Sequence, residues 1–212
     1  MIQLASIIIR KLSNVFRKLM RLQPRFIGSA KYWENRYVDG GSSGAGSYGH
    51  LAEFKANIIN DFVAKNQVKT VIEFGCGDGN QLTYAQYPQY VGVDISKKAV
   101  EICREKFKND STKEFLLYEM NDFVNQKKIT ADLGLSLDVI FHLVEDKKFY
   151  LYIKNLFNCS DKFVIIYSSN YEEEKINAQH VRHRNFSNYV SQAFKNWELV
   201  KKKIGRASCR ER

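Results

Sequence analysis

Three glycines at alternate positions mark the first stretch of this chain that could do chemistry. They are Gly75, Gly77 and Gly79, and they follow an apolar run over residues 68–74. An apolar run that ends in glycines is typical of a buried strand leading into a tight turn. Because glycine has no Cβ and tolerates a positive φ, such a turn lets the backbone press against a ligand. We expect a helix over residues 80–87, whose free N–H groups would face the same ligand.

The spacing of the glycines distinguishes two ligands that such turns commonly hold, a dinucleotide and S-adenosyl-L-methionine. A dinucleotide turn follows G-x-G-x-x-G/A, and its third small residue would fall where this chain has Asn80. Here the glycines alternate, and Glu73 precedes them. The sequence E-F-G-C-G-D-G, from Glu73 to Gly79, resembles motif I of the class I S-adenosylmethionine-dependent methyltransferases. The resemblance covers residues 31–203 and implies that Glu73, Cys76 and the three glycines surround the methionine part of the cofactor. Cys76 is expected there as a small packing residue rather than a nucleophile.

A carboxylate at the end of the next predicted strand supports this assignment. Residues 90–96 predict the second strand, and Asp94 lies near its end. In open parallel sheets ligands lie at the carboxyl ends of the strands, and one carboxylate can accept both hydroxyls of a ribose. We therefore expect Asp94 and the adjacent Ile95 to contact the adenosyl part of the cofactor. The alternative is that Asp94 caps the helix predicted over 97–108, although Ser96 could provide that cap.

The family resemblance implies three further cofactor contacts. After a short third strand at 115–119, Asp122 and Phe123 match the position that holds the adenine ring in the family. Asp122 could instead cap a short helix. A fourth strand is expected over 131–137, and Asp138 directly after it should line the cleft shared by cofactor and substrate.

Residues 31–50 combine closely spaced aromatic side chains with glycine and serine. Because glycines supply hinges and aromatic rings exclude water, this segment predicts a lid loop over the cofactor, with Tyr48 among the contacts. A purely structural loop is the alternative. The pattern Y-W-E-N-R-Y followed by G-G-S-S-G-A-G-S-Y-G resembles the N-terminal segment of uncharacterised bacterial methyltransferases that often occur with surface-glycan genes. A helix is expected next, over residues 51–66.

Three histidines are candidate general bases. His142 follows the fourth strand, whose end faces the methyl group in the family, and a histidine can take a proton from a hydroxyl or an amine. His180 and His183 are its rivals in the segment H-V-R-H-R, where Arg182 and Arg184 could bind a carboxylate or phosphate of the substrate. The alternatives are that His142 only packs against the next helix and that the basic segment is a solvated charge run.

The rest of the pattern completes an α/β fold. Helices are expected over 147–157 and 187–194, and strands over 162–169 and 196–203. The resemblance implies a three-layer αβα Rossmann-like methyltransferase fold with a mostly parallel sheet in the order 3-2-1-4-5-(7)-6. No sequence remains for strand 7, so we expect it to be missing by truncation and the sheet edge near strand 6 to be incomplete.

The positive charge of the chain is concentrated near its start. The formal net charge is +10 over 212 residues, and residues 1–22 predict an amphipathic helix with a basic face. That helix would pack on the domain or on a partner, or lie on a membrane surface. Its uncharged part, residues 1–9, is too short to span a bilayer, and no signal-peptide cleavage site follows it. Because the basic residues gather in one helix, a nucleic-acid partner is not expected.

Four parts of the chain are expected. They are a basic N-terminal helix (1–30), a lid loop and helix (31–66), a methyltransferase core (67–203) and a tail (204–212). The tail resembles the translated read-through of a sequencing adapter, so we exclude it from the fold as non-native. The four cysteines have no C-x-x-C spacing, so neither a metal site nor a disulfide framework is expected. A cytoplasmic location suits them, with peripheral contact at the inner membrane surface through residues 1–22.

These features predict methyl transfer from S-adenosyl-L-methionine to a small-molecule or sugar-like acceptor, which would be anionic if the two arginines bind it. Two alternatives stay open. A nicotinamide-dependent oxidoreductase would share the Rossmann fold and the ribose carboxylate. A non-catalytic membrane-surface adaptor would instead use the basic helix at residues 1–22.

Overall fold

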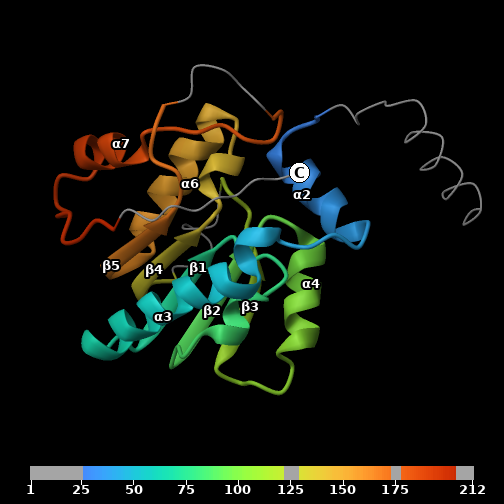
Figure 1. The fold of residues 1–212 in the computed structure, drawn as a ribbon, viewed down its shortest axis with the longest axis horizontal. Coiled ribbons are helices and arrows are strands. Elements are labelled where there is room, and N and C mark those ends of the chain that lie inside the picture. Colours follow the sequence, from blue (N-terminus) through green and yellow to red (C-terminus); the bar gives the residue numbers. More distant parts are fainter. Residues whose placement is uncertain (1–25, 122–128, 173–177, 204–212) are drawn as a thin grey trace, which may run out of the picture.

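The computed structural model of the chain describes residues 26–121, 129–172 and 178–203 (Figure 1). Several predictions concern residues outside these ranges: the basic helix at 1–22, the tail at 204–212, and the adenine contacts Asp122 and Phe123. They stay predictions. Within the described ranges, no helix is both long enough and apolar enough to cross a membrane.

The centre of the fold is a five-stranded sheet in the order β3-β2-β1-β4-β5, with every neighbouring pair parallel. The strands are β1 Thr70–Phe74, β2 Gln89–Asp94, β3 Lys113–Leu117, β4 Ala131–Leu137 and β5 Ser160–Tyr167. This order confirms the predicted arrangement of the first five strands. In the register, Phe74 pairs with Val93, and Glu73 pairs with Leu135. The carboxyl ends of β1, β2 and β4 therefore meet at one edge of the sheet.

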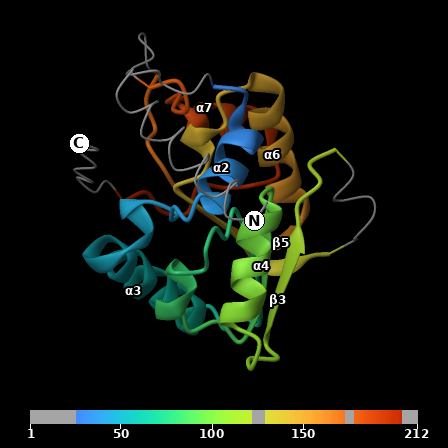
Figure 2. The same cartoon turned by 90° about the vertical axis from the view of Figure 1, so that its right-hand side faces the viewer.

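Helices cover both faces of this sheet (Figure 1 and Figure 2). The α-helices are α2 Ser29–Val38, α3 Gly49–Lys65, α4 Lys97–Lys106, α6 Asp146–Asn158 and α7 Phe186–Ala193. Short 3-10 helices are η1 Ala45–Ser47, η2 Gln81–Tyr84 and η3 Ile140–His142. Side chains of α3 and α4 pack in one buried cluster with one face of the sheet, and those of α6 and α7 pack against the other face. The predicted three-layer αβα architecture is therefore confirmed.

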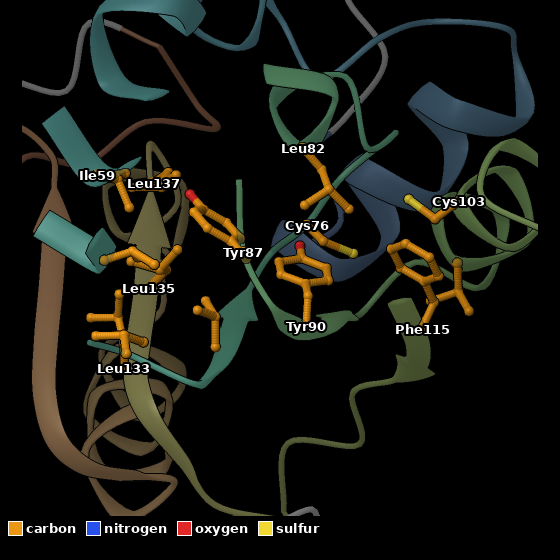
Figure 3. Close-up of a cluster of buried hydrophobic side chains, with 14 residues drawn as sticks. Ile59, Cys76, Leu82, Tyr87, Tyr90, Cys103, Phe115, Leu133, Leu135 and Leu137 are labelled. Carbon is orange, nitrogen blue, oxygen red and sulfur yellow. The ribbon is translucent and has the colours of Figure 1, made fainter. Parts of the chain in front are cut away.

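Successive residues of the central strands face opposite layers. In β1, Val71 lies in the cluster beneath α3 and α4, whereas Phe74 lies in the cluster beneath α6. Figure 3 shows the first cluster, in which Leu133, Leu135 and Leu137 project in a row from β4. A parallel strand covered on both faces needs apolar residues at nearly every position, which explains the continuous apolar runs in the sequence.

The helix predicted over 80–87 is wrong, because only the single turn η2 forms there. Asn60 of α3 holds the chain that follows: its side chain accepts from the backbone N of Gln86 at 2.9 Å and donates to the carbonyl of Tyr84 at 3.0 Å. Pro88 then precedes β2. Since α3 already covers this face of the sheet, the connection from β1 to β2 runs without a second helix. The expected helix N-terminus facing the ligand is absent from this position.

The sixth strand predicted over 196–203 is also wrong. These residues form no strand, and Leu199 and Val200 are 74% and 84% exposed. Trp197 instead packs edge-on against Phe157 of α6, with the ring centroids 5.1 Å apart. A strand requires a paired backbone and a covered face, and this segment has neither. Within the described residues the sheet ends at β5, without strand 6 or strand 7.

The first half of the predicted lid loop is helical. Residues 29–38 form α2, in which Trp33 and Tyr37 lie one turn apart with ring centroids separated by 5.9 Å. The aromatic residues at this spacing mark a helix face, a signal that the glycine-rich composition of the second half obscured. The loop itself is confined to residues 39–48 and includes η1.

Candidate active site

A cavity opens where β1, β2 and β4 end. It holds about 820 Å³ of empty space, including the part open to solvent. Its walls come from α2, the loop at 39–48, the glycine turn after β1 and the residues after β4. The predicted site residues that line it are Glu73, Gly75, Cys76, Gly77, Asp94, Ile95, Asp138 and His142. The structure therefore brings most of the predicted cofactor contacts together with one predicted base.

The three glycines of the turn have φ angles of 81°, 57° and 70° and are crowded by different neighbours. A Cβ at Gly75 would lie 2.5 Å from Cγ2 of Val139, and one at Gly77 would overlap the Ser43 hydroxyl. A Cβ at Gly79 would instead lie 2.9 Å from the ring of Phe107, on the core side of the turn. Gly75 and Gly77 thus shape the cavity, whereas Gly79 permits packing against α4 and does not line the cavity.

Asp94 lies directly against the glycine turn. Its Oδ2 accepts from the backbone N of Gly77 at 2.9 Å, and its Oδ1 accepts from the backbone N of Ser96 at 2.8 Å. Only 7% of the residue is exposed, and this burial raises the pKa of Asp94 to about 6. The cap of α4 is Ser96, whose Oγ accepts from the backbone N of Ala99 at 3.0 Å. Asp94 therefore has the place predicted for a ribose-binding carboxylate. The alternative, that Asp94 caps α4, does not apply, because Ser96 provides that cap.

Three charged side chains gather near the ends of β1 and β4. Glu73 is buried and accepts from the hydroxyl of Tyr90 at 2.7 Å; its burial raises its pKa to about 7. Asp138 forms an ion pair with Lys55 of α3, at 2.6 Å between Nζ and Oδ2. Lys55 was not predicted from the sequence as a site residue. Its signal was a lysine in the apolar stripe of a helix, between Ala52 and Ile59.

The loop at 39–48 is fastened to the glycine turn through Asp78. The backbone N of Ser43 donates to Oδ2 of Asp78 at 2.9 Å, and the backbone N of Asp78 donates to Oγ of Ser43 at 2.9 Å. Tyr48 adds a third bond, from its hydroxyl to Oδ2 of Asp78 at 2.7 Å. Burial acts to raise the pKa of Asp78, but these hydrogen bonds outweigh it and hold the pKa below its usual value. We call Ser43, Tyr48 and Asp78 the loop latch. Tyr48, which was predicted to contact the cofactor, does not line the cavity. Its hydroxyl is part of the loop latch instead.

Two aromatic residues of α2 form part of the cavity wall, although neither was predicted individually as a site residue. Trp33 meets the His142 ring edge-on, with the centroids 4.8 Å apart. Tyr37 is buried, and its hydroxyl lies 3.0 Å from Oγ of Ser43. The helix α2 therefore links the loop latch to the region around His142.

His142 is held in one tautomer by a backbone group. Its Nδ1 lies 3.1 Å from the carbonyl oxygen of His180. A carbonyl can only accept, so Nδ1 carries the proton and Nε2 has the free lone pair. Burial lowers the pKa of His142 to about 4, so the ring is neutral near pH 7. Of the three predicted histidines, this is the one whose side chain lines the cavity.

His180 and His183 lie beside the cavity without lining it. The His180 ring stacks on Tyr32, with centroids 4.5 Å apart, and lies parallel to His142 at 5.8 Å. His183 makes a hydrogen bond of 2.6 Å between Nδ1 and Oγ of Ser169, and it stacks on Tyr171. His180 thus orients His142 through its backbone, and neither ring is placed against the glycine turn.

The two predicted substrate-binding arginines contact the loop that precedes α6. Arg184 is buried and donates to the carbonyls of Leu143 at 2.7 Å and Val144 at 3.0 Å, and to Asp146 at 3.0 Å. Arg182 is about one-third exposed and pairs with the same Asp146 at 3.0 Å. Substrate binding by Arg184 would require these internal contacts to break, whereas Arg182 keeps an accessible edge.

The donor set of the cavity fits S-adenosyl-L-methionine. A nucleoside sugar needs a carboxylate such as Asp94 for its vicinal hydroxyls, and the crowded glycines Gly75 and Gly77 admit a ligand close to the backbone. Glu73 and Asp138 line the same cavity, where the predicted site places the methionine end of the cofactor. The individual roles of these residues stay predictions.

Comparison with known proteins agrees with this reading. A family model described as a methyltransferase domain matches residues 65–207. The magnesium protoporphyrin IX methyltransferase ChlM from Synechocystis PCC 6803, solved with bound SAM, has a TM-score of 0.56 at 14% identity, covering 80% of this chain and 88% of that one. The methyltransferase domain of the bacterial CtHen1 has a TM-score of 0.54 at 19% identity, covering 69% and 86%.

A third similar structure is the N-methyltransferase NodS from Bradyrhizobium japonicum WM9 in complex with S-adenosyl-L-homocysteine. Its TM-score is 0.53 at 14% identity, covering 63% of this chain and 68% of that one. No curated protein sequence matches the chain. At these identities the similar structures show the shared fold alone. The family match spans more than half of the chain and leaves the oxidoreductase alternative without support. The chain therefore belongs to the methyltransferase-domain family and is a class I S-adenosyl-L-methionine-dependent methyltransferase.

Proposed function

We propose that this methyltransferase acts on a small-molecule or sugar-like acceptor whose hydroxyl or amine is held by Nε2 of His142. The observation that carries the proposal is the fixed tautomer of His142 inside the cavity, set by the 3.1 Å contact with the carbonyl of His180. S-adenosyl-L-methionine supplies a methyl group activated by the adjoining sulfonium. The contributions of the protein are then the orientation of the acceptor and the exclusion of water.

The low basicity of His142 defines its role. With a pKa of about 4, the ring remains neutral and accepts a hydrogen bond from the acceptor without first removing its proton. The acceptor hydrogen becomes acidic as the acceptor atom forms its bond to the methyl carbon. Nε2 takes the proton at that stage, as a general base positioned within hydrogen-bond reach does.

The cavity wall around His142 supports an acceptor with a flat or ring-shaped body. Trp33 meets the His142 ring edge-on, and Leu143 follows His142 in the chain. Met120, Ser29 and Lys148 line the same cavity. Few polar groups on an apolar wall are typical of small-molecule sites. The resemblance of residues 31–50 to methyltransferases found with surface-glycan genes favours a sugar ring among such molecules.

Arg182 is our candidate residue for binding an anionic group on the acceptor. Its guanidinium is about one-third exposed. The backbone N of Arg182 donates at 2.8 Å to the carbonyl of Phe141, the residue that precedes His142 in the chain. We assign Arg184 to holding the loop before α6, because its donors bind Leu143, Val144 and Asp146.

The test is a methyl-transfer assay of the full chain with S-adenosyl-L-methionine and a panel of sugars, sugar nucleotides and phenols. On the accepted substrate, His142→Ala should lower kcat by about 100-fold or more, the usual contribution of a positioned base. The affinity for S-adenosyl-L-homocysteine should stay within about twofold, since the imidazole faces the acceptor. His50→Ala, an exposed histidine on α3, is the matched control.

Unchanged turnover in His142→Ala would move the base to another residue. His180→Ala and His183→Ala belong in the same series for this reason. If His180→Ala alone stopped turnover, the ring of His180 rather than that of His142 would hold the acceptor.

A further inference from the structure

The outer side of α6 carries a groove that is separate from the active-site cavity. It lies between α6 and α7, which are neighbours in the fold (Figure 1), and holds about 930 Å³ of empty space, including the part open to solvent. We call this hollow the α6–α7 groove. Its polar and aromatic lining residues are Lys147, Tyr150, Lys154 and Asn158 from α6, and Tyr189 and Phe194 from α7 and its end.

The α6 wall of the groove is a stripe at helical spacing. Three or four positions separate each member from the next, so Lys147, Tyr150, Lys154 and Asn158 lie on one side of the helix. Tyr150 is 46% exposed, and its ring contacts that of Tyr189, with the centroids 4.8 Å apart. This contact with α7 holds the Tyr150 ring in place and leaves much of it open to solvent. The groove therefore offers a fixed aromatic surface to a ligand.

The groove is also positively charged. Lys147 and Lys154 are exposed, and within the described residues the ion pairs of the first turn of α6 involve Asp146 and Lys148 instead. The flanking segments 147–158 and 186–196 contain no aspartate or glutamate. At a rise of ~1.5 Å per residue, the two lysines are about 10 Å apart along the helix. A ligand that meets both of them is therefore extended and anionic.

An acidic sugar chain suits these side chains better than a peptide or a membrane surface. The negative face of a tyrosine ring attracts the C–H groups of a sugar, and lysine and asparagine donate to its carboxylates and hydroxyls. An extended peptide needs backbone partners, which two helices with internally bonded backbones do not offer. Membrane surfaces are bound by apolar groups that protrude, whereas these rings line a hollow.

The groove begins next to the active-site cavity. Lys147 lies between Asp146, which pairs with Arg182 at 3.0 Å, and Lys148, which lines the cavity. Because α6 begins at Asp146, the groove leads away from the cavity along the helix from its first turn. A chain in the groove can therefore place its end beside Arg182, the residue assigned above to an anionic group of the acceptor.

We propose that the α6–α7 groove binds an anionic oligosaccharide and that the acceptor is the sugar at the end of this chain. The proposal rests on the proposed function and names its substrate class, a chain that contains uronic acids rather than a free sugar. The groove residues bind and position the chain and take no part in methyl transfer. Their loss should therefore raise KM for an accepted chain and leave kcat unchanged.

Binding is tested with oligogalacturonate, which carries a carboxylate on every sugar. Isothermal titration into the full chain compares the monomer with oligomers of increasing length, and affinity should rise until the chain spans both lysines. Neutral maltooligosaccharides should bind at least about tenfold more weakly, since they lack the charge. Lys147→Gln/Lys154→Gln should raise the Kd of the longer oligomers by about tenfold or more, and Tyr150→Ser by about fivefold.

The matched control removes the same charge from the opposite face of the sheet. Lys65→Gln/Lys97→Gln replaces two exposed lysines of α3 and α4 and should leave the Kd within about twofold. An equal Kd in the groove and control variants would overturn the proposal, and so would equal binding of the maltooligosaccharide. Polyglutamate, oligothymidylate and vesicles of anionic phospholipid belong in the same series. If one of these bound through the groove and oligogalacturonate did not, the groove would belong to another class of partner.

The acceptor has a separate readout. His142→Ala should leave the Kd of oligogalacturonate within about twofold, because the imidazole lines the cavity and not the groove. If the chain bound through the groove but no sugar were methylated, the proposed function would fail and the binding site would remain. If sugars were methylated with the same KM in the groove variants, the groove proposal would fail and the proposed function would remain.

Discussion

The backbone N of Gly77 and Oδ2 of Asp94 are joined by a hydrogen bond of 2.9 Å. This bond connects the turn after β1 to the end of β2, so the two halves of the expected cofactor site are fixed to each other. The same carboxylate accepts from Ser96 at 2.8 Å, yet its burial still raises its pKa to about 6. Asp94 is thus a preorganised acceptor whose ionisation falls within an experimentally accessible pH range.

Cofactor affinity should depend on the ionisation of Asp94. The predicted role of Asp94 requires its carboxylate form to accept the ribose hydroxyls. The Kd of S-adenosyl-L-homocysteine should therefore be flat above about pH 7 and rise by roughly tenfold per unit below pH 6. Asp94→Asn should weaken binding by about tenfold or more at pH 8, through the loss of a charged acceptor. It should also remove the acid limb of the titration curve. The measurement is calorimetry at pH 5 to 8, and an acid limb that persisted in Asp94→Asn would assign it to another group.

Glu73 should make the free protein less stable as the pH rises. Its pKa is about 7 when folded, against an ordinary value of 4.5, so the folded state binds the extra proton. The stability that goes with that proton is fully present below about pH 4.5 and is lost as the pH rises through 7. A shift of this size corresponds to roughly 3 kcal/mol.

Glu73→Gln isolates this effect from other titrating groups. The difference in free energy of unfolding between the variant and the unaltered protein should grow in favour of the variant between pH 5 and 8. Urea titrations at each pH provide the measurement. A constant difference over that range would mean that Glu73 titrates normally.

Some residues of the candidate site could be predicted from the sequence pattern, and others could not. The positions of Gly75 and Asp94 were predictable, because a strand, a turn and a second strand put their ends on one edge of a parallel sheet. Lys55 was not assigned, since its role depends on which face of α3 the fold buries. Arg184 was interpreted as a substrate ligand, but its donors meet the carbonyls of Leu143 and Val144 from a segment 40 residues away in sequence.

The two wrong predictions of secondary structure have a similar cause. The segments 80–87 and 196–203 carry apolar residues at acceptable spacing, but secondary structure also requires a surface to cover. At 80–87 that surface is taken by α3, whose Asn60 binds the extended chain. At 196–203 no neighbouring strand pairs with the segment within the described residues. The conformations of both segments are therefore determined by tertiary contacts, which the local sequence does not encode.

The loop latch should control how fast the cofactor product leaves. Ser43→Ala removes the hydroxyl that accepts from the backbone N of Asp78 and contacts Tyr37. Losing a hydrogen bond of about 1 kcal/mol should increase the dissociation rate of S-adenosyl-L-homocysteine by about fivefold. Trp33 lines the cavity, so its fluorescence can report dissociation in a stopped-flow experiment. Ser191→Ala on α7, far from the latch in sequence, is the control, and an equal rate in both variants would show that the latch does not gate release.

Gly75 offers a test of whether crowding or backbone strain makes glycine necessary in the turn. Gly75 and Gly40 have nearly equal φ angles, 81° and 80°, but a Cβ at Gly40 meets nothing within 4 Å, whereas one at Gly75 meets Val139. Gly40→Ala therefore measures strain alone, expected at about 1–2 kcal/mol of stability. Gly75→Ala should cost more and should also abolish binding of S-adenosyl-L-homocysteine, because Val139 or the turn must move.

The double variant Gly75→Ala/Val139→Ala completes this comparison. Shortening Val139 removes the methyl groups that the new Cβ would strike. The loss of stability in the double variant should therefore equal the loss in Gly40→Ala plus the smaller loss that Val139→Ala causes by itself. Binding of S-adenosyl-L-homocysteine should return in part, since the turn can then keep its path against Asp94. Thermal unfolding and calorimetry provide the two readouts. If Gly75→Ala behaved like Gly40→Ala from the outset, the contact with Val139 would have no part in shaping the site, and backbone strain alone would explain why glycine stands there.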